Sequence, residues 1–119
     1  MGEQLRHTQV VFDGENGDCV QAAVATALQL PLVAVPNFST FGGFWYHAMA
    51  LWGATRGIYV RWAPLGEPLP DADVIAIGLA ARGHKHAVVW RGDHMVHDPH
   101  PDRSGLVDTE SFIILERRA

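Results

Sequence analysis

The chain has one cysteine, no long apolar run and few basic residues. One cysteine among 119 residues cannot form an internal disulfide, so we expect a reducing, cytoplasmic setting. No apolar run approaches the ~20 residues of a membrane-spanning helix, and the polar N-terminus leads into no signal segment, so we expect no membrane association. A net charge of −4 argues against a nucleic-acid partner, because phosphate binding requires a basic surface.

The remaining composition is that of a globular domain. Hydrophobic residues make up 48% of the chain and charged residues 18%, which allows a core without disulfides or metal ions. We find no internal repeat, low-complexity tract or linker. The sequence therefore predicts a single domain over residues 1–119.

Hydrophobic periodicity changes along the chain from helical to extended. We expect a helix from Cys19 to Leu30, where apolar residues recur at three- and four-residue steps, and a second helix from Ser39 or Thr40 to near Gly57. We expect a short extended segment at Gln9–Phe12. Alternating or compact apolar runs predict strands at Ile58–Trp62, Asp73–Leu79, His86–Arg91, His94–Asp98 and Phe112–Leu115. This order predicts an α+β domain with helices on one side of an antiparallel sheet.

The cysteine stands at a predicted helix start. Asp18 is a favourable N-cap residue, and Gln21 three positions later completes a capping-box pattern, so the helix should begin at Cys19. A thiol in the first turn lies near unpaired backbone N–H groups and the positive end of the helix dipole, which favour the thiolate. We therefore interpret Cys19 as a candidate nucleophile.

A histidine and an aspartate in the C-terminal third could complete a catalytic set with the cysteine. Five of the seven histidines lie at positions 84, 86, 94, 97 and 100. A three-residue hairpin loop at 91–93 would place His86 directly opposite Asp98, on one face of the sheet. A two-residue turn at Gly92–Asp93 would shift the register by one residue, and the pair could then meet only with a bulge.

Cys19, His86 and Asp98 together would form a nucleophile, a general base and a carboxylate that orients the base. The developing oxyanion needs hydrogen-bond donors. The backbone N–H of Cys19 would supply one, and the side chain of Gln9 or of Asn16 a second. This chemistry needs no cofactor and no metal ion.

Several segments in this order resemble the papain-like cysteine peptidase superfamily, in particular its small bacterial and phage members akin to double-glycine leader peptidases. The segments are Gly17-Asp18-Cys19-Val20-Gln21-Ala22, Leu28-Gln29-Leu30-Pro31-Leu32, Val35-Pro36-Asn37-Phe38, His86-Ala87-Val88-Val89 and Val96-His97-Asp98-Pro99-His100-Pro101. The resemblance implies a papain-like fold, with the nucleophile at the start of the first helix. It also implies cleavage of a peptide or isopeptide bond in a peptide or protein substrate by Cys19, His86 and Asp98, with an upstream glutamine in the oxyanion hole.

Other interpretations remain open at this level. Cys19 could be a small core residue, and the same fold could serve as an inactive binding module with a rim formed by Trp45, His84 and His100. In the enzyme, these three residues would border the substrate cleft, with Tyr46 beside Trp45. A metal-binding protein is a further alternative, with His94, His97 and His100, or His84 with His86, as imidazole ligands.

Overall fold

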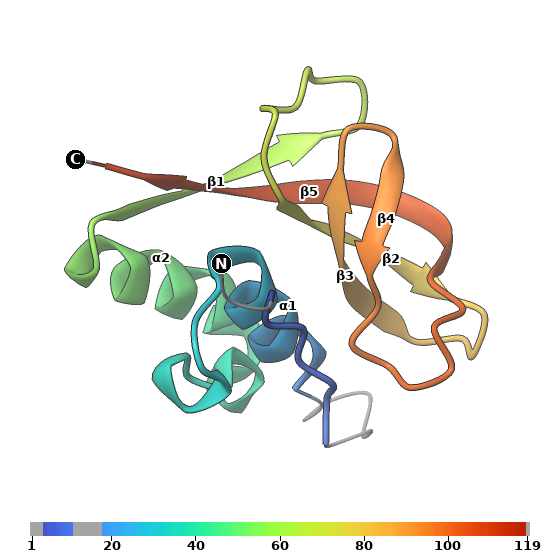
Figure 1. The fold of residues 1–119 in the computed structure, drawn as a ribbon, viewed down its shortest axis with the longest axis horizontal. Coiled ribbons are helices and arrows are strands. Elements are labelled where there is room, and N and C mark those ends of the chain that lie inside the picture. The colour runs from blue at the N-terminus through green and yellow to red at the C-terminus, as the bar shows by residue number, and fades with distance from the viewer. Residues whose placement is uncertain (1–3, 11–17, 119) are drawn as a thin grey trace.

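The computed structural model describes residues 4–10 and 18–118 (Figure 1). The helical elements precede the strands along the chain. They are α1 (Cys19–Leu28), the 3₁₀ segments η1 (Leu32–Ala34) and η2 (Phe38–Phe44), and α2 (Trp45–Thr55). The strands are β1 (Ile58–Pro64), β2 (Val74–Ala80), β3 (Lys85–Arg91), β4 (His94–His97) and β5 (Leu106–Arg117).

The five strands form one antiparallel sheet in the order β1-β5-β2-β3-β4. Figure 1 shows α1 and α2 together along one side of this curved sheet. The predicted α+β class, with helices preceding an antiparallel sheet, is therefore confirmed. The last strand, β5, lies between β1 and β2 and so joins the two halves of the sheet.

The main core lies between the helices and the sheet. α1 buries Ala22, Ala23 and Ala25 completely, and these small side chains let the helix approach β3 closely. α2 packs on β1 through Gly53, where an added Cβ would lie 2.9 Å from the carbonyl oxygen of Ile58. A second, smaller cluster that includes Val88 and Phe112 covers the opposite face of the sheet.

The helices differ from prediction at their ends. α1 begins at Cys19 as predicted but ends at Leu28, because Gln29 adopts a left-handed conformation at φ 57° and its N–H closes the last turn. The second helical region is a kinked 3₁₀ segment followed by α2. Asn37, not Ser39 or Thr40, caps it by accepting the Ser39 N–H.

Within the described residues no single helix is long and apolar enough to cross a membrane. The helical pair Cys19–Leu28 and Leu32–Thr55, which is bent by 103°, has the length and composition of a membrane span when these two properties alone are considered.

The strands match prediction except at the two ends of the chain. β5 begins at Leu106, six residues before the predicted start, because the intervening polar residues hide its pairing with β2. Of the predicted extended segment Gln9–Phe12, the structure describes Gln9 and Val10, which lie outside the sheet. Residues 11–17, with the rest of that segment, lie outside the described residues.

Candidate active site

Cys19 is the first residue of α1 and is partly exposed. The capping box predicted around it is wrong, since the Asp18 side chain makes no cap hydrogen bond. The Asp18 carboxylate instead accepts the backbone N–H of Val10, at 3.0 and 3.2 Å, and Gln21 donates to the carbonyl oxygen of Val35 at 2.7 Å. The side chain before the cysteine therefore anchors the N-terminal segment rather than the helix.

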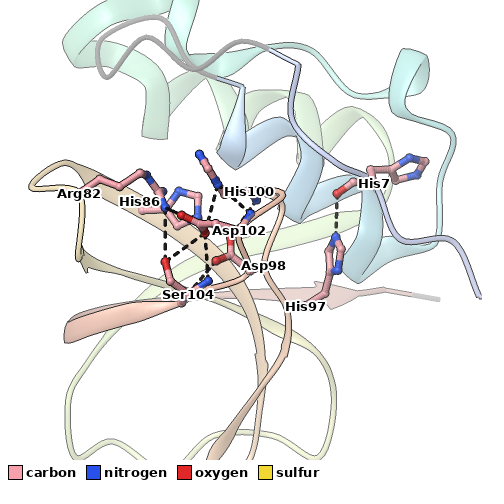
Figure 2. A network of polar contacts seen from close by, with 9 residues as sticks. His7, Arg82, His86, His97, Asp98, His100, Asp102 and Ser104 are labelled. Carbon is pink, nitrogen blue, oxygen red and sulfur yellow. Dashed lines mark hydrogen bonds and ion pairs between the residues drawn. The ribbon is translucent and has the colours of Figure 1, made fainter.

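His86 and Asp98 form a buried hydrogen-bonded pair, as predicted. The Nε2 atom of His86 lies 2.6 Å from Oδ1 of Asp98, and their side chains are 3% and 0% exposed. Figure 2 shows this pair in a group of polar side chains that also includes His100 and Asp102. Cys19 lies near enough to His86 to contribute to its pKa, and since Nε2 is bound to the carboxylate, Nδ1 is the ring nitrogen left to face the thiol.

The pair meets through a two-residue turn and a bulge. The turn at Gly92–Asp93 joins Arg91 to His94, and Val96 on β4 is the extra residue opposite the step from Trp90 to Val89 on β3. Beyond the bulge Val89 pairs with His97, so the same register would align Val88 with residue 98. Of the two cases that the sequence left open, the two-residue turn with a bulge is therefore the one found, and His86 and Asp98 are not directly opposed. The bulge restores a shared face, and the two side chains meet diagonally.

The surroundings of His86 favour its imidazolium form. Burial lowers the pKa of His86, but hydrogen bonds to Asp98 and Cys19 and the charges of both partners raise it from 6.5 to about 9. A cationic ring beside the thiol is the partner that a thiolate needs. The electrostatics therefore favour a charged His86 ring in this site.

A tight loop after β4 holds the Asp98 carboxylate in place. Oδ1 also accepts the backbone N–H of His100 at 2.9 Å, and Oδ2 accepts that of Gly105 at 2.8 Å. Burial raises the pKa of the Asp98 carboxyl, but the hydrogen bonds from His86 and from these backbone groups outweigh burial and lower it below 3.8. Asp98 is thus a fixed anion with both oxygens oriented.

The N-terminal segment carries Gln9 to this region. The backbone N–H of Gln9 donates to the carbonyl oxygen of Pro99 at 2.9 Å, and the next residue, Val10, binds Asp18. Gln9 is therefore held between the residue after Asp98 and the residue before Cys19, and it is 5% exposed. Asn16, the other candidate for the oxyanion hole, lies outside the described residues.

The three predicted rim residues lie in different places. The ring of His100 packs edge-to-face on His86, with centroids 6.3 Å apart, and His84 is exposed in the turn between β2 and β3. Trp45 and Tyr46 line a pocket of about 300 Å³ between the start of α2 and the sheet. The other lining residues are Trp62, Ile77, Ser111 and Ile113.

The described residues give no support to the metal alternative. Within residues 4–10 and 18–118, no group of three His, Cys, Asp or Glu side chains is arranged to hold a metal ion. His97 is buried and its Nε2 donates to the carbonyl oxygen of His7 at 2.8 Å, whereas His94 is exposed beside Asp93. The three proposed ligands therefore point to different partners.

Sequence reasoning missed two sets of polar contacts near the site. The N-terminal segment contacts His97 and the end of α1, and a second carboxylate, Asp102, binds Arg82, Ser104 and His100. The first had no local signal, because its partners are about 20 or 90 residues apart. The second had one, since Asp102 and Ser104 two residues later form a typical turn pair.

Comparisons of the chain with family models, curated proteins and solved structures found no match. The site therefore rests on its geometry: a thiol at a helix start, near a histidine that a buried aspartate orients.

Proposed function

We propose that the protein is a papain-like cysteine hydrolase that cleaves an amide bond in a peptide or protein through an acyl-enzyme. One observation carries the proposal: His86 lies beside Cys19, which contributes to its pKa, and its Nε2 atom lies 2.6 Å from the buried Asp98 carboxylate. This is the arrangement that a nucleophile, a general base and an orienting carboxylate require.

In the first half of the reaction, the Cys19 thiolate attacks the carbonyl carbon and the carbonyl π electrons move to oxygen. The backbone N–H of Cys19, which is free of the helix ladder, and the side-chain amide of Gln9 would donate to the oxyanion. As the tetrahedral intermediate collapses, the C–N bond breaks and the Nδ1 proton of His86 passes to the leaving amine. The products are an amine and a Cys19 thioester.

In the second half, neutral His86 accepts a proton from water while the water oxygen attacks the thioester. The C–S bond breaks, a carboxylic acid leaves, and the thiolate–imidazolium pair is restored. An amine in place of water would give acyl transfer by the same steps. Product analysis with and without an added amine distinguishes the two outcomes, and a thiol that must remain reduced suits a cytoplasmic location.

We infer the substrate class from the pocket beside α2. Ile77 in its wall pairs with Ala87, the residue after His86, so the pocket lies on the strand next to the one that carries the general base. Its lining is almost entirely apolar and aromatic, and about 300 Å³ would accept one large apolar side chain. A peptide library should therefore be cut beside such side chains, and Trp45→Ala should weaken that preference.

The rate of Cys19 alkylation by iodoacetamide between pH 4 and 9 tests the proposal before any substrate is known. Wild-type Cys19 should react rapidly at pH 6, where an ordinary thiol of pKa near 8.5 reacts slowly. His86→Ala should return the profile to that of an ordinary thiol. His94→Ala, at an exposed histidine of the same hairpin, is the matched control. An inert Cys19, or equal profiles for wild type and His86→Ala, would reject the enzyme in favour of the binding module.

A further inference from the structure

The ladder between β3 and β4 ends before the His86–Asp98 pair. Its last paired residues are Val89 and His97, whereas His86 lies nearer the start of β3 and Asp98 follows the end of β4. On its other side β3 continues to pair with β2, where Gly78 lies opposite His86. The strand pairing that holds His86 therefore does not extend to Asp98, whose carboxylate depends on the loop that follows it.

The loop of residues 98–105 has a backbone conformation that costs free energy. Arg103 is in the left-handed region at φ 53°, which is unfavourable for a residue with a Cβ atom. Gly105 is in the same region at φ 74°, and a Cβ atom there would lie 3.1 Å from Sδ of Met95. The N–H of Gly105 is the group that donates to Oδ2 of Asp98. The contacts that keep this loop in shape therefore also keep a donor on the carboxylate.

Asp102 connects this loop to the turn between β2 and β3. Its Oδ1 atom accepts the backbone N–H and the hydroxyl of Ser104, both at 3.0 Å. Its Oδ2 atom lies 2.8 Å from Nη1 of Arg82, which stands in the turn that leads into β3 and His86 (Figure 2). The ion pair therefore joins the segment before His86 to the segment after Asp98.

This ion pair fixes geometry more than it adds stability. The backbone hydrogen bond from Ser104 is the largest of the contacts that lower the pKa of Asp102 to about 2, and the Arg82 guanidinium adds to it, so Asp102 is an anion near neutral pH. The side chains of Arg82 and Asp102 are 27% and 41% exposed, and ion pairs at such sites contribute little to the free energy of unfolding. Substitutions at either residue should therefore leave the fold intact.

We propose that Arg82 and Asp102 are positioning residues that keep Asp98 aligned with His86 through the loop between them. With the ion pair in place, the loop keeps its backbone donors on the carboxylate, and Oδ1 of Asp98 stays directed at Nε2 of His86. Without the ion pair the loop relaxes, the carboxylate samples other orientations, and the His86 imidazolium loses part of its support. This proposal rests on the proposed function, because it assigns two more residues a task in the same site.

The rate of Cys19 alkylation at pH 6 distinguishes positioning from a direct effect of charge. Asp102→Asn removes an anion, which by charge alone would favour the thiolate and raise the rate, whereas Arg82→Gln removes a cation and would lower it. If both residues act through the loop, both variants should lower the rate, by about two- to fivefold. The double variant should lose no more than the more affected single variant, because the two residues act as one unit.

Two further variants serve as controls. Arg82→Lys keeps the charge and one donor, so it should recover part of the rate that Arg82→Gln loses. Lys85→Gln breaks the ion pair between Lys85 and Glu110, at the start of the same strand, and should leave the rate at its wild-type value. Urea denaturation of each variant separates a loss of alignment from a loss of folding.

Salt provides a test on the wild-type protein that needs no variant to fold. About 1 M NaCl screens the partly exposed Arg82–Asp102 pair far more than the buried His86–Asp98 pair, so it should lower the alkylation rate at pH 6. A wild-type rate that does not respond to salt, or a rate that rises or is unchanged in folded Asp102→Asn, would overturn the proposal. If His86→Ala still lowers Cys19 reactivity, the enzyme proposal survives that result; if it does not, both proposals fail.

Discussion

His86 and His97 belong to the same hairpin and are almost equally buried, at 4% and 2% exposed, yet their pKa values move in opposite directions. Burial lowers the pKa of both rings. His86 has a carboxylate and a thiol as partners, and its pKa rises to about 9. His97 has a peptide carbonyl and lies near Arg103 and Arg6, so its pKa stays below 6.5. The charge of a buried histidine is therefore set by its partners.

The surroundings of His86 and of His97 also differ in the contacts that they make. The His86 region holds charged groups around a partly exposed thiol. The His97 region joins the N-terminal segment to β4, since Nε2 of His97 donates to the His7 carbonyl while the His7 N–H donates to Thr26 in α1. Among the described residues the other ring nitrogen of His97, Nδ1, is buried without a hydrogen-bond partner. We interpret His86 as catalytic and His97 as structural.

Removing the Asp98 carboxylate should abolish the pKa difference between His86 and His97, and it should have the largest effect of the substitutions considered. In Asp98→Asn the His86 ring loses its anion, its pKa falls, and the alkylation rate of Cys19 at pH 6 should drop by roughly 10²–10⁴-fold. Asp93→Asn, at a fully exposed carboxylate beside the hairpin turn, is the control and should leave the rate unchanged. A wild-type rate in folded Asp98→Asn would show that Asp98 does not support His86.

His97→Phe should instead reduce stability. Loss of the hydrogen bond to the His7 carbonyl should cost about 1–3 kcal/mol of the free energy of unfolding, measured by urea denaturation at pH 7. His97→Gln, whose side-chain amide can still donate to that carbonyl, should lose less. Equal losses in the two variants would mean that packing, and not this hydrogen bond, is what His97 contributes.

The pH dependence of stability should separate the histidines further. Because the pKa of His97 is lowered in the folded state, the unfolded chain binds the extra proton as pH falls below 6.5, and stability falls by at most ~1.4 kcal/mol per pH unit. The raised pKa of His86 contributes in the opposite sense in that window, but equally in wild type and in His97→Gln, so the difference between the two proteins reports on His97. Urea denaturation at pH 6.5, 5.75 and 5 should show a shallower loss for His97→Gln than for wild type, and parallel losses would contradict this assignment.

The smallest effect is expected at Thr26, whose hydroxyl accepts the hydrogen bond from the His7 N–H. Thr26→Val keeps the shape of a buried side chain but leaves the His7 N–H without its acceptor, at a cost of about 1 kcal/mol in the free energy of unfolding. The Cys19 alkylation profile should not change. A change in that profile would mean that the N-terminal segment is coupled to the reactivity of the thiol.

The sequence predicted the fold class and the helix that starts at Cys19, because periodicity and turn residues are local signals. It also predicted that His86 meets Asp98 but left two registers open, since a bulge adds one residue and leaves no mark in the hydrophobic pattern. The role of Asp18 was missed because its partner, Val10, lies across a loop. The contact of His100 with His86 follows from the bulge and could not be predicted without it.

The bulge in the hairpin also has a practical consequence for labelling and engineering. Moving its extra residue into the turn would give a three-residue loop and a regular ladder, with Val89 still opposite His97 and the same chain length. The turn at Gly92–Asp93 can therefore be redesigned without changing the other end of the hairpin, where Asp98 is held. A fluorophore or an affinity tag grafted at this tip should leave the thiol chemistry intact.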